Sequence, residues 1–148
     1  MGAFRSVLKP TRIVANLVGL MLFVQVILGG SAVFGFINVN YHIVWGAVTF
    51  VVLIVATVYA ARELGSKSTL FRTGIAAIVD YLVQIILGFV ALGPNSGAVV
   101  VVHLTNAFLL GVLVTYLISF ADSADEASVR MLSQTHIVPR RTPLFFQN

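Results

Sequence analysis

The sequence predicts an all-α integral membrane protein, a four-helix bundle built from two tandem helical hairpins. Three observations predict it: an apolar composition, two long runs almost free of charge, and an internal repeat. Of the 148 residues, 59% are hydrophobic and 9% are charged, whereas soluble domains contain about 25% charged residues. The mean hydropathy of +1.01 agrees with a membrane protein. Cysteine is absent, which excludes disulfides, thiolate metal sites and iron–sulfur clusters.

The first pair of helices comes from the segment between Arg12 and Arg62, which contains 49 residues and no charged side chain. One helix needs about 20 apolar residues to cross a bilayer, so this run is long enough for two spans. The polar residues at 38–42 divide the run. We therefore expect helices over 13–36 and 42–61, the first too long to be a cleaved signal sequence.

The second pair comes from the run between Thr73 and Ala121, whose one charge is Asp80. A Gly-Pro-Asn-Ser-Gly segment at 93–97 interrupts it, and such a cluster cannot continue a helix. Helices are therefore expected over 73–92 and 99–121. The prediction is a transmembrane domain at 13–121, a short N-terminal segment at 1–12 and a tail at 122–148 that is amphipathic or disordered.

The basic residues predict the orientation of the chain in the membrane. With four spans, all nine lie on the same side: Arg5, Lys9, Arg12, Arg62, Lys67, Arg72, Arg130, Arg140 and Arg141. The positive-inside rule then places both termini of this multi-pass protein in the cytoplasm, in a cell (plasma) membrane. This distribution accounts for the net charge of +4. We therefore expect the lipid bilayer, and no nucleic acid, as a partner.

An internal repeat relates the two hairpins. Phe-Val-Gln-Val-Ile-Leu-Gly at 23–29 matches Leu-Val-Gln-Ile-Ile-Leu-Gly at 82–88, which pairs Gln25 with Gln84 at an offset of 59 residues. His42 and His103 correspond at an offset of 61. Because both hairpins start on the same side, the repeats are parallel, with an axis along the membrane normal.

The two repeated histidines are the candidate ligands of a cofactor. Each lies near the external start of its helix, and the small residues Gly46 and Ala107 follow at i+4 on the same face. Two imidazoles at matched depth beside small residues suit the axial ligation of a heme iron by His42 and His103. Two other interpretations stay open: histidines bonded to water or headgroups, and a Zn or Cu site with an incomplete ligand set. His136 has no counterpart in the repeat, and we do not expect it to bind the cofactor.

These residues resemble one four-helix half of the heme A synthase family over about residues 12–121. The family carries a histidine at the external end of its second and fourth helices, as His42 and His103 do here, with a His-x-x-x-Ala pattern. Its first and third helices carry a Gln-x-x-Leu-Gly-type stretch, matched at Gln25 and Gln84. The resemblance implies heme b as cofactor, with heme O as substrate and heme A as product of a half-length enzyme that oxidises the heme methyl group to a formyl group.

Two departures bear on catalysis. The family's catalytic glutamate, three residues before the first histidine, is replaced by Val39, and the arginine that follows that histidine is replaced by Ile43. Two functions therefore stay open. The first is heme A synthase activity, in a homo-oligomer. The second is a non-catalytic membrane cytochrome b that serves quinol or a respiratory terminal oxidase as an electron-transfer or accessory subunit.

Polar residues inside the spans have two interpretations each. Asp80 precedes Gln84 by one helical turn and should face the bundle interior. It could supply a proton route or a contact below the heme, or be a protonated carboxyl bonded to Gln84, Asn16 or a neighbouring subunit. Gln25 and Gln84 could contact the cofactor or simply join helices. The same choice between membrane anchor and pocket wall applies to three aromatic residues: Tyr41, Trp45 and Tyr81.

Overall fold

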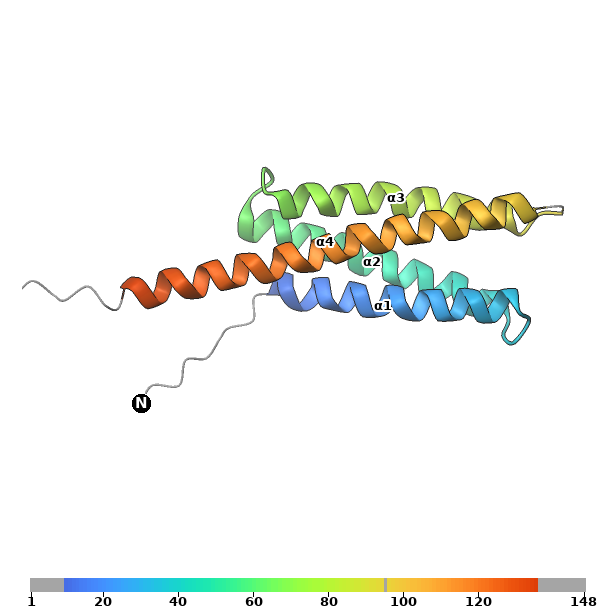
Figure 1. Cartoon of the computed structure of the whole chain (residues 1–148), viewed down its shortest axis with the longest axis horizontal. Helices are drawn as coiled ribbons and strands as arrows, with labels where there is room; N and C mark the ends of the chain where they lie inside the picture. The colour runs from blue at the N-terminus through green and yellow to red at the C-terminus, as the bar shows by residue number, and fades with distance from the viewer. Residues whose placement is uncertain (1–9, 95, 136–148) are drawn as a thin grey trace, which may run out of the picture.

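The structure, a computed structural model, describes residues 10–94 and 96–135. It contains four helices and, in this part of the chain, no strand: α1 (Pro10–Val33), α2 (Val39–Leu64), α3 (Thr69–Ala91) and α4 (Gly97–Thr135) (Figure 1). Each is long and apolar enough to cross a membrane, since the shortest, of 23 residues, extends about 35 Å against a hydrocarbon core of about 30 Å. The predicted all-α, membrane-spanning four-helix bundle is confirmed.

Local hydrogen bonding explains where the helices begin and end. The Asn38 side chain caps α2 by accepting a hydrogen bond from the backbone N–H of Asn40, at 2.9 Å, so part of the expected polar turn is the start of the helix. The Ser68 hydroxyl caps α3 by accepting a hydrogen bond from the backbone N–H of Phe71, so that α3 begins at Thr69, four residues before the predicted start. In the connection after α1, Gly35 has a φ of +74°, a left-handed conformation that favours glycine. The chain therefore leaves the helix here, and α1 ends at Val33, three residues earlier than predicted.

The fourth helix is longer than predicted, because it continues past Ala121 to Thr135. Charged residues end the apolar span near Asp122, but no glycine or proline lies between 122 and 135 to end the helix itself. The first part of the predicted tail is therefore helical. Residues 136–148, including His136, lie outside the described part of the chain.

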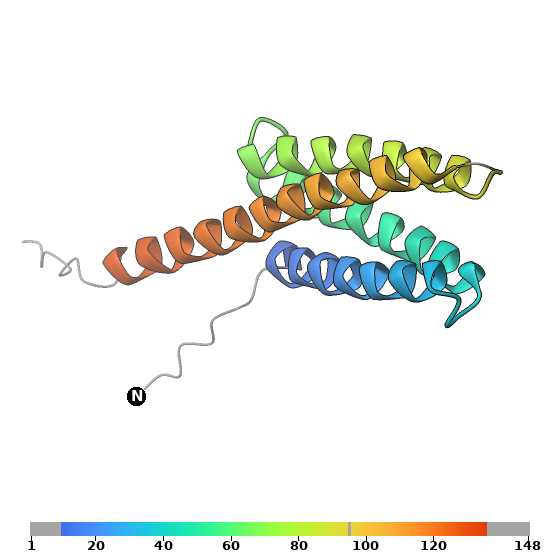
Figure 2. The ribbon, with the colours of Figure 1, turned by 45° about the vertical axis from the view of Figure 1, so that its right-hand side comes forward.

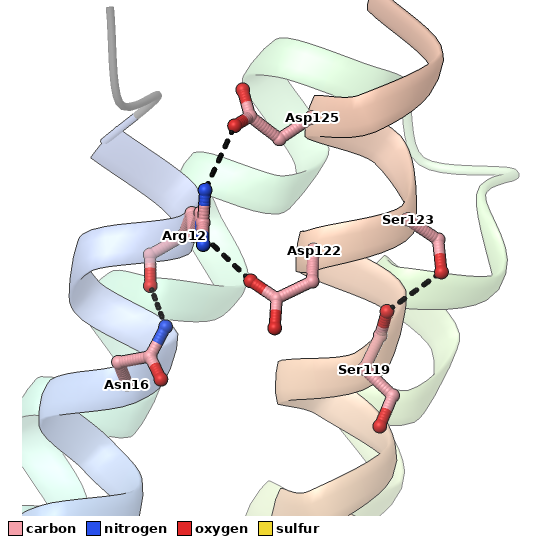
Figure 3. A network of polar contacts seen from close by, with 6 residues as sticks. All are labelled: Arg12, Asn16, Ser119, Asp122, Ser123 and Asp125. Atoms are coloured by element: carbon pink, nitrogen blue, oxygen red, sulfur yellow. Dashed lines mark hydrogen bonds and ion pairs between the residues drawn. The ribbon is translucent and has the colours of Figure 1, made fainter. Parts of the chain in front are cut away.

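An ion-pair network joins the start of α1 to this extension of α4 (Figure 3). Arg12 Nε lies 2.7 Å from an Asp122 carboxylate oxygen, and Arg12 Nη1 lies 3.1 Å from Asp125 Oδ2. Asp125 is buried, with 6% of its surface exposed. The network therefore connects the first and last helices at the end of the bundle that carries the basic residues.

The four helices form a closed ring in which α1 packs on α2 and α4, and α3 packs on the same two helices. The buried core lies in the half of the bundle near Arg12, around Val18, Leu53, Leu110 and Leu117. Toward the opposite end, which carries the turns inside each hairpin, the two hairpins diverge (Figure 2). The bundle is thus tightly packed at one end and leaves space between the hairpins at the other.

Glycines let the two hairpins approach closely in the packed half. A Cβ atom built at Gly74 of α3 would lie 2.5 Å from the Thr57 hydroxyl of α2, and one at Gly19 of α1 would lie 2.7 Å from the Ile118 side chain of α4. Small residues at helix interfaces are common in membranes, where close van der Waals packing drives association. These contacts join the hairpins and hold one end of the bundle together.

Candidate functional site

A cavity of about 410 Å³ lies between the hairpins in the half of the bundle where they diverge. Its size falls within the range of about 300–1,000 Å³ that is typical of small-molecule and cofactor sites. All four helices line it, mainly with apolar side chains. The lining includes every residue that the sequence predicts as a cofactor contact: Gln25, His42, Gly46, Gln84, His103 and Ala107.

The two histidines approach each other across this cavity. His42 is on α2 and His103 on α4, diagonal helices that do not pack on each other. Their ring centroids are 6.4 Å apart and the ring planes make an angle of 80°. Two imidazoles that bind one metal ion from opposite sides, with metal–nitrogen bonds of about 2.0 Å, have centroids about 6.3 Å apart. The separation therefore matches that of two axial ligands on one metal ion.

Each histidine is paired with the glutamine of its own hairpin. The Nε2 atoms of Gln25 and His42 are 3.3 Å apart, and the same distance separates the Nε2 atoms of Gln84 and His103. The Nδ1 of His42 lies 3.1 Å from the Gln25 carbonyl oxygen. Since a carbonyl can only accept, this Nδ1 carries the proton, and the lone pair on Nε2 of the neutral ring can accept a hydrogen bond from the Gln25 amide. The repeat thus produces two similar amide–imidazole pairs.

The glycine that ends each repeated motif makes room for the histidine. A Cβ at Gly29 would lie 2.9 Å from Cε1 of His42, and one at Gly88 would lie 3.2 Å from Cε1 of His103. Four residues separate this glycine from the glutamine, so both lie on one face of the helix. The Gln-x-x-Leu-Gly pattern therefore has a physical explanation, because the glutamine contacts the imidazole and the glycine lets the ring lie against the backbone.

Gly46 lines the cavity and also makes contacts that the sequence did not indicate. A Cβ at this position would lie 2.7 Å from the Gln25 amide nitrogen, so the missing side chain makes room for that glutamine. The Gly46 carbonyl also accepts a hydrogen bond from the Tyr81 hydroxyl, at 3.0 Å. Tyr81 is buried and lines the cavity, which decides between the two interpretations of this residue in favour of a pocket wall.

The other two aromatic residues that the sequence singled out, Trp45 and Tyr41, are not among the residues that line the cavity. Trp45 is half-buried and donates from Nε1 to the Met21 carbonyl oxygen, at 2.9 Å. It thereby joins α2 to α1. Tyr41 is exposed over 66% of its surface, as expected of a residue that faces the membrane interface.

Asp80 does not line the cavity. Its Oδ2 is buried with no hydrogen-bond partner among the described residues. Asn16, which the sequence suggested as a partner, bonds the Arg12 carbonyl on its own helix instead. Asn106 of α4 donates to Gln84 Oε1 at 2.9 Å. The sequence analysis did not identify Asn106 as a site residue. The signal that could have found it is the internal repeat, in which the polar Asn106 stands at the position that Trp45 has in the first hairpin.

The ligand set of the site fits a heme better than a bare metal ion. Among the described residues, no group of three or more His, Asp or Glu side chains could hold a metal, whereas Zn and Cu sites use three or four protein ligands. A heme brings four ring nitrogens of its own and needs only axial ligands from the protein. Two histidines that line one apolar cavity would meet that need once each Nε2 is released from the glutamine of its own hairpin.

Comparison with protein-family models, curated proteins and solved structures gives no match for this chain. The resemblance to the heme A synthase family therefore rests on the residues themselves and stays a prediction.

Proposed function

We propose that this chain is a membrane heme-binding protein of the half-length heme A synthase type, with His42 and His103 as the two axial ligands. The observation that carries the proposal is the 6.4 Å separation of the two imidazole centroids in an apolar cavity. A bound heme would supply one-electron redox chemistry at its iron. The chain would contribute the two imidazoles, their orientation by Gln25 and Gln84, and a pocket that excludes water.

The proposal includes an orientation in the cell membrane. The ends of the helices at which Arg12, Arg62 and Arg72 lie would face the cytoplasm, because basic residues are retained on that side. Both termini would then be cytoplasmic, and the histidine pair would lie in the external half of the bilayer. A heme held there would be within reach of an electron donor or acceptor on the external side.

A specific observation favours a second candidate, a non-catalytic membrane cytochrome b. Val39, at the place of the family's catalytic glutamate, lines the cavity, as does Ile43 at the place of the arginine. The wall beside His42 is therefore apolar where the enzyme family has a carboxylate. In this alternative the chain carries electrons between quinol and a respiratory oxidase, and in the first it oxidises heme O within a homo-oligomer.

Heme binding is tested by the reduced-minus-oxidised spectrum of the purified full chain. The unaltered protein should show a low-spin heme, and His42→Ala and His103→Ala should each lose it, because one axial ligand cannot maintain the low-spin state. His136→Ala is the matched control and should keep the spectrum. An unchanged low-spin spectrum in both single variants, with helix content verified by circular dichroism, would refute the ligand assignment.

Chromatography of the extracted hemes separates the two candidates. Heme O or heme A beside heme b, from cells that supply heme O, would support the synthase. Heme b alone would support the electron-transfer or accessory subunit. A protein purified from heme-replete cells with no heme of any kind would overturn both.

A further inference from the structure

A glutamine amide covers the Nε2 nitrogen of each histidine. In both hairpins the amide Nε2 lies 3.3 Å from the imidazole Nε2. A metal that takes this nitrogen has to displace the amide, since both cannot use one lone pair. The hydrogen bonds that hold each glutamine therefore decide how easily its histidine becomes available.

The first hairpin holds its glutamine weakly. The side-chain oxygen Oε1 of Gln25 is buried without a hydrogen-bond partner among the described residues, and Nε2 is engaged by His42. The His42 ring itself is held separately, by its Nδ1 hydrogen bond to the Gln25 backbone carbonyl. The amide can thus move away from the ring while the ring keeps its orientation.

The second hairpin holds its glutamine at both ends. Gln84 Oε1 accepts a hydrogen bond from Asn106 Nδ2 at 2.9 Å, and Gln84 Nε2 donates to the His103 carbonyl oxygen at 3.0 Å. Uncovering the His103 ring nitrogen therefore costs two hydrogen bonds more than uncovering that of His42.

The repeat shows that this second network belongs to one hairpin only. At the offset of 61 residues that relates the histidines, Asn106 corresponds to Trp45. The indole of Trp45 donates to the Met21 backbone carbonyl and leaves the Gln25 side-chain oxygen without a partner. At the offset of the glutamines, Asp80 corresponds to Met21. The two hairpins therefore share the contact between the glutamine amide and the imidazole Nε2. They differ at Nδ1, which bonds the Gln25 backbone carbonyl in His42 and has no hydrogen-bond partner among the described residues in His103, and they differ in the residues directly below.

We infer that Asn106 is a positioning residue that keeps Gln84 over the His103 ring, so that the histidine pair takes up heme in a fixed order, His42 before His103. The inference rests on the proposed function. Because Gln84 has two additional hydrogen bonds to break, uptake at His103 should be about tenfold slower or more than uptake at His42. Loss of the Asn106 amide should remove much of this difference.

The test compares the rates at which the two single-histidine variants of the full chain, in detergent, bind hemin in a stopped-flow absorbance experiment. His103→Ala reports uptake at His42, and His42→Ala reports uptake at His103. We expect the second rate to be about tenfold lower. Adding Asn106→Leu should accelerate the His42→Ala variant and leave the His103→Ala variant unchanged. Thr105→Val, an exposed neighbour, is the control and should change neither rate.

Equal rates in the two single-histidine variants, or a difference that Asn106→Leu leaves as large as before, would overturn the inference while heme binding itself stands. If these variants retain no hemin, the slow phase of the unaltered chain is measured instead, and an Asn106→Leu variant that leaves it unchanged overturns the inference. Asn106→Ser replaces Asn106→Leu if circular dichroism shows that the latter does not fold. No hemin binding by the unaltered chain would overturn the proposed function.

Discussion

The replacement Gly29→Ala is a sharp test of the site, because one methyl group would meet the edge of a candidate ligand. The new Cβ would lie 2.9 Å from Cε1 of His42. Since carbon atoms in contact prefer about 3.5–4.0 Å, the ring would have to move by about 0.6–1 Å. Such a shift would disturb the hydrogen bond from His42 Nδ1 to the Gln25 backbone carbonyl, and loss of a bond that orients a metal ligand typically reduces metal affinity by about 10–100-fold. We expect heme affinity to fall about tenfold, measured by titration of the Soret band.

The repeat and a distant glycine provide the controls. Gly88→Ala, the same change in the second hairpin, would place its Cβ 3.2 Å from Cε1 of His103 and should have a smaller effect. At Gly111 of α4 a Cβ meets nothing within 4 Å, so Gly111→Ala should leave affinity unchanged and stabilise the helix by about 0.5–1 kcal/mol. A Gly29→Ala protein with the affinity of the unaltered chain would refute the packing of His42 against α1. Equal losses at Gly29 and Gly111 would show a general effect of alanine.

Two further predictions concern stability, measured by thermal unfolding in detergent. Tyr81→Phe removes a buried hydrogen bond from α3 to α2 and should lower the free energy of unfolding by about 1 kcal/mol. Tyr116→Phe, at an exposed ring, is the control and should have little effect. Equal losses in the two variants would contradict the assigned bond. Gly74→Ala places a Cβ 2.5 Å from the Thr57 hydroxyl and should destabilise by about 1–3 kcal/mol. A gain like that expected for Gly111→Ala would contradict close packing of α2 and α3.

Much of the fold could be predicted from the sequence, because membrane insertion depends on local hydropathy. Two uncharged or nearly uncharged runs divided by polar turns were enough to predict four spans. The ends of the helices were less accurate, since they depend on single hydrogen bonds and on turn conformations such as those at Asn38 and Gly35. The end of α4 was predicted too early because the polarity of residues after Ala121 ends a span without ending a helix.

Part of the candidate site could be predicted from a different signal, the internal repeat. The repeat pairs His42 with His103 and Gln25 with Gln84 at nearly constant offsets, so a shared structural role is visible in the sequence. The roles of the glycines were not visible, because the contact of Gly29 with His42 depends on how α1 and α2 are rotated about their axes. The hydrogen bond from Asn106 to Gln84 also joins two helices and could not be derived from spacing along either one.

The sequence by itself determined that this chain crosses a membrane four times and carries two equivalent histidines on its second and fourth helices. Only the tertiary structure decided that α2 and α4 stand diagonally across an apolar cavity, with the imidazole centroids 6.4 Å apart. Hydropathy and a repeat specify which residues are alike and how deep they lie. The distance between them depends on how side chains from all four helices pack, here tightly around Leu53 and Leu110 at one end and openly at the other.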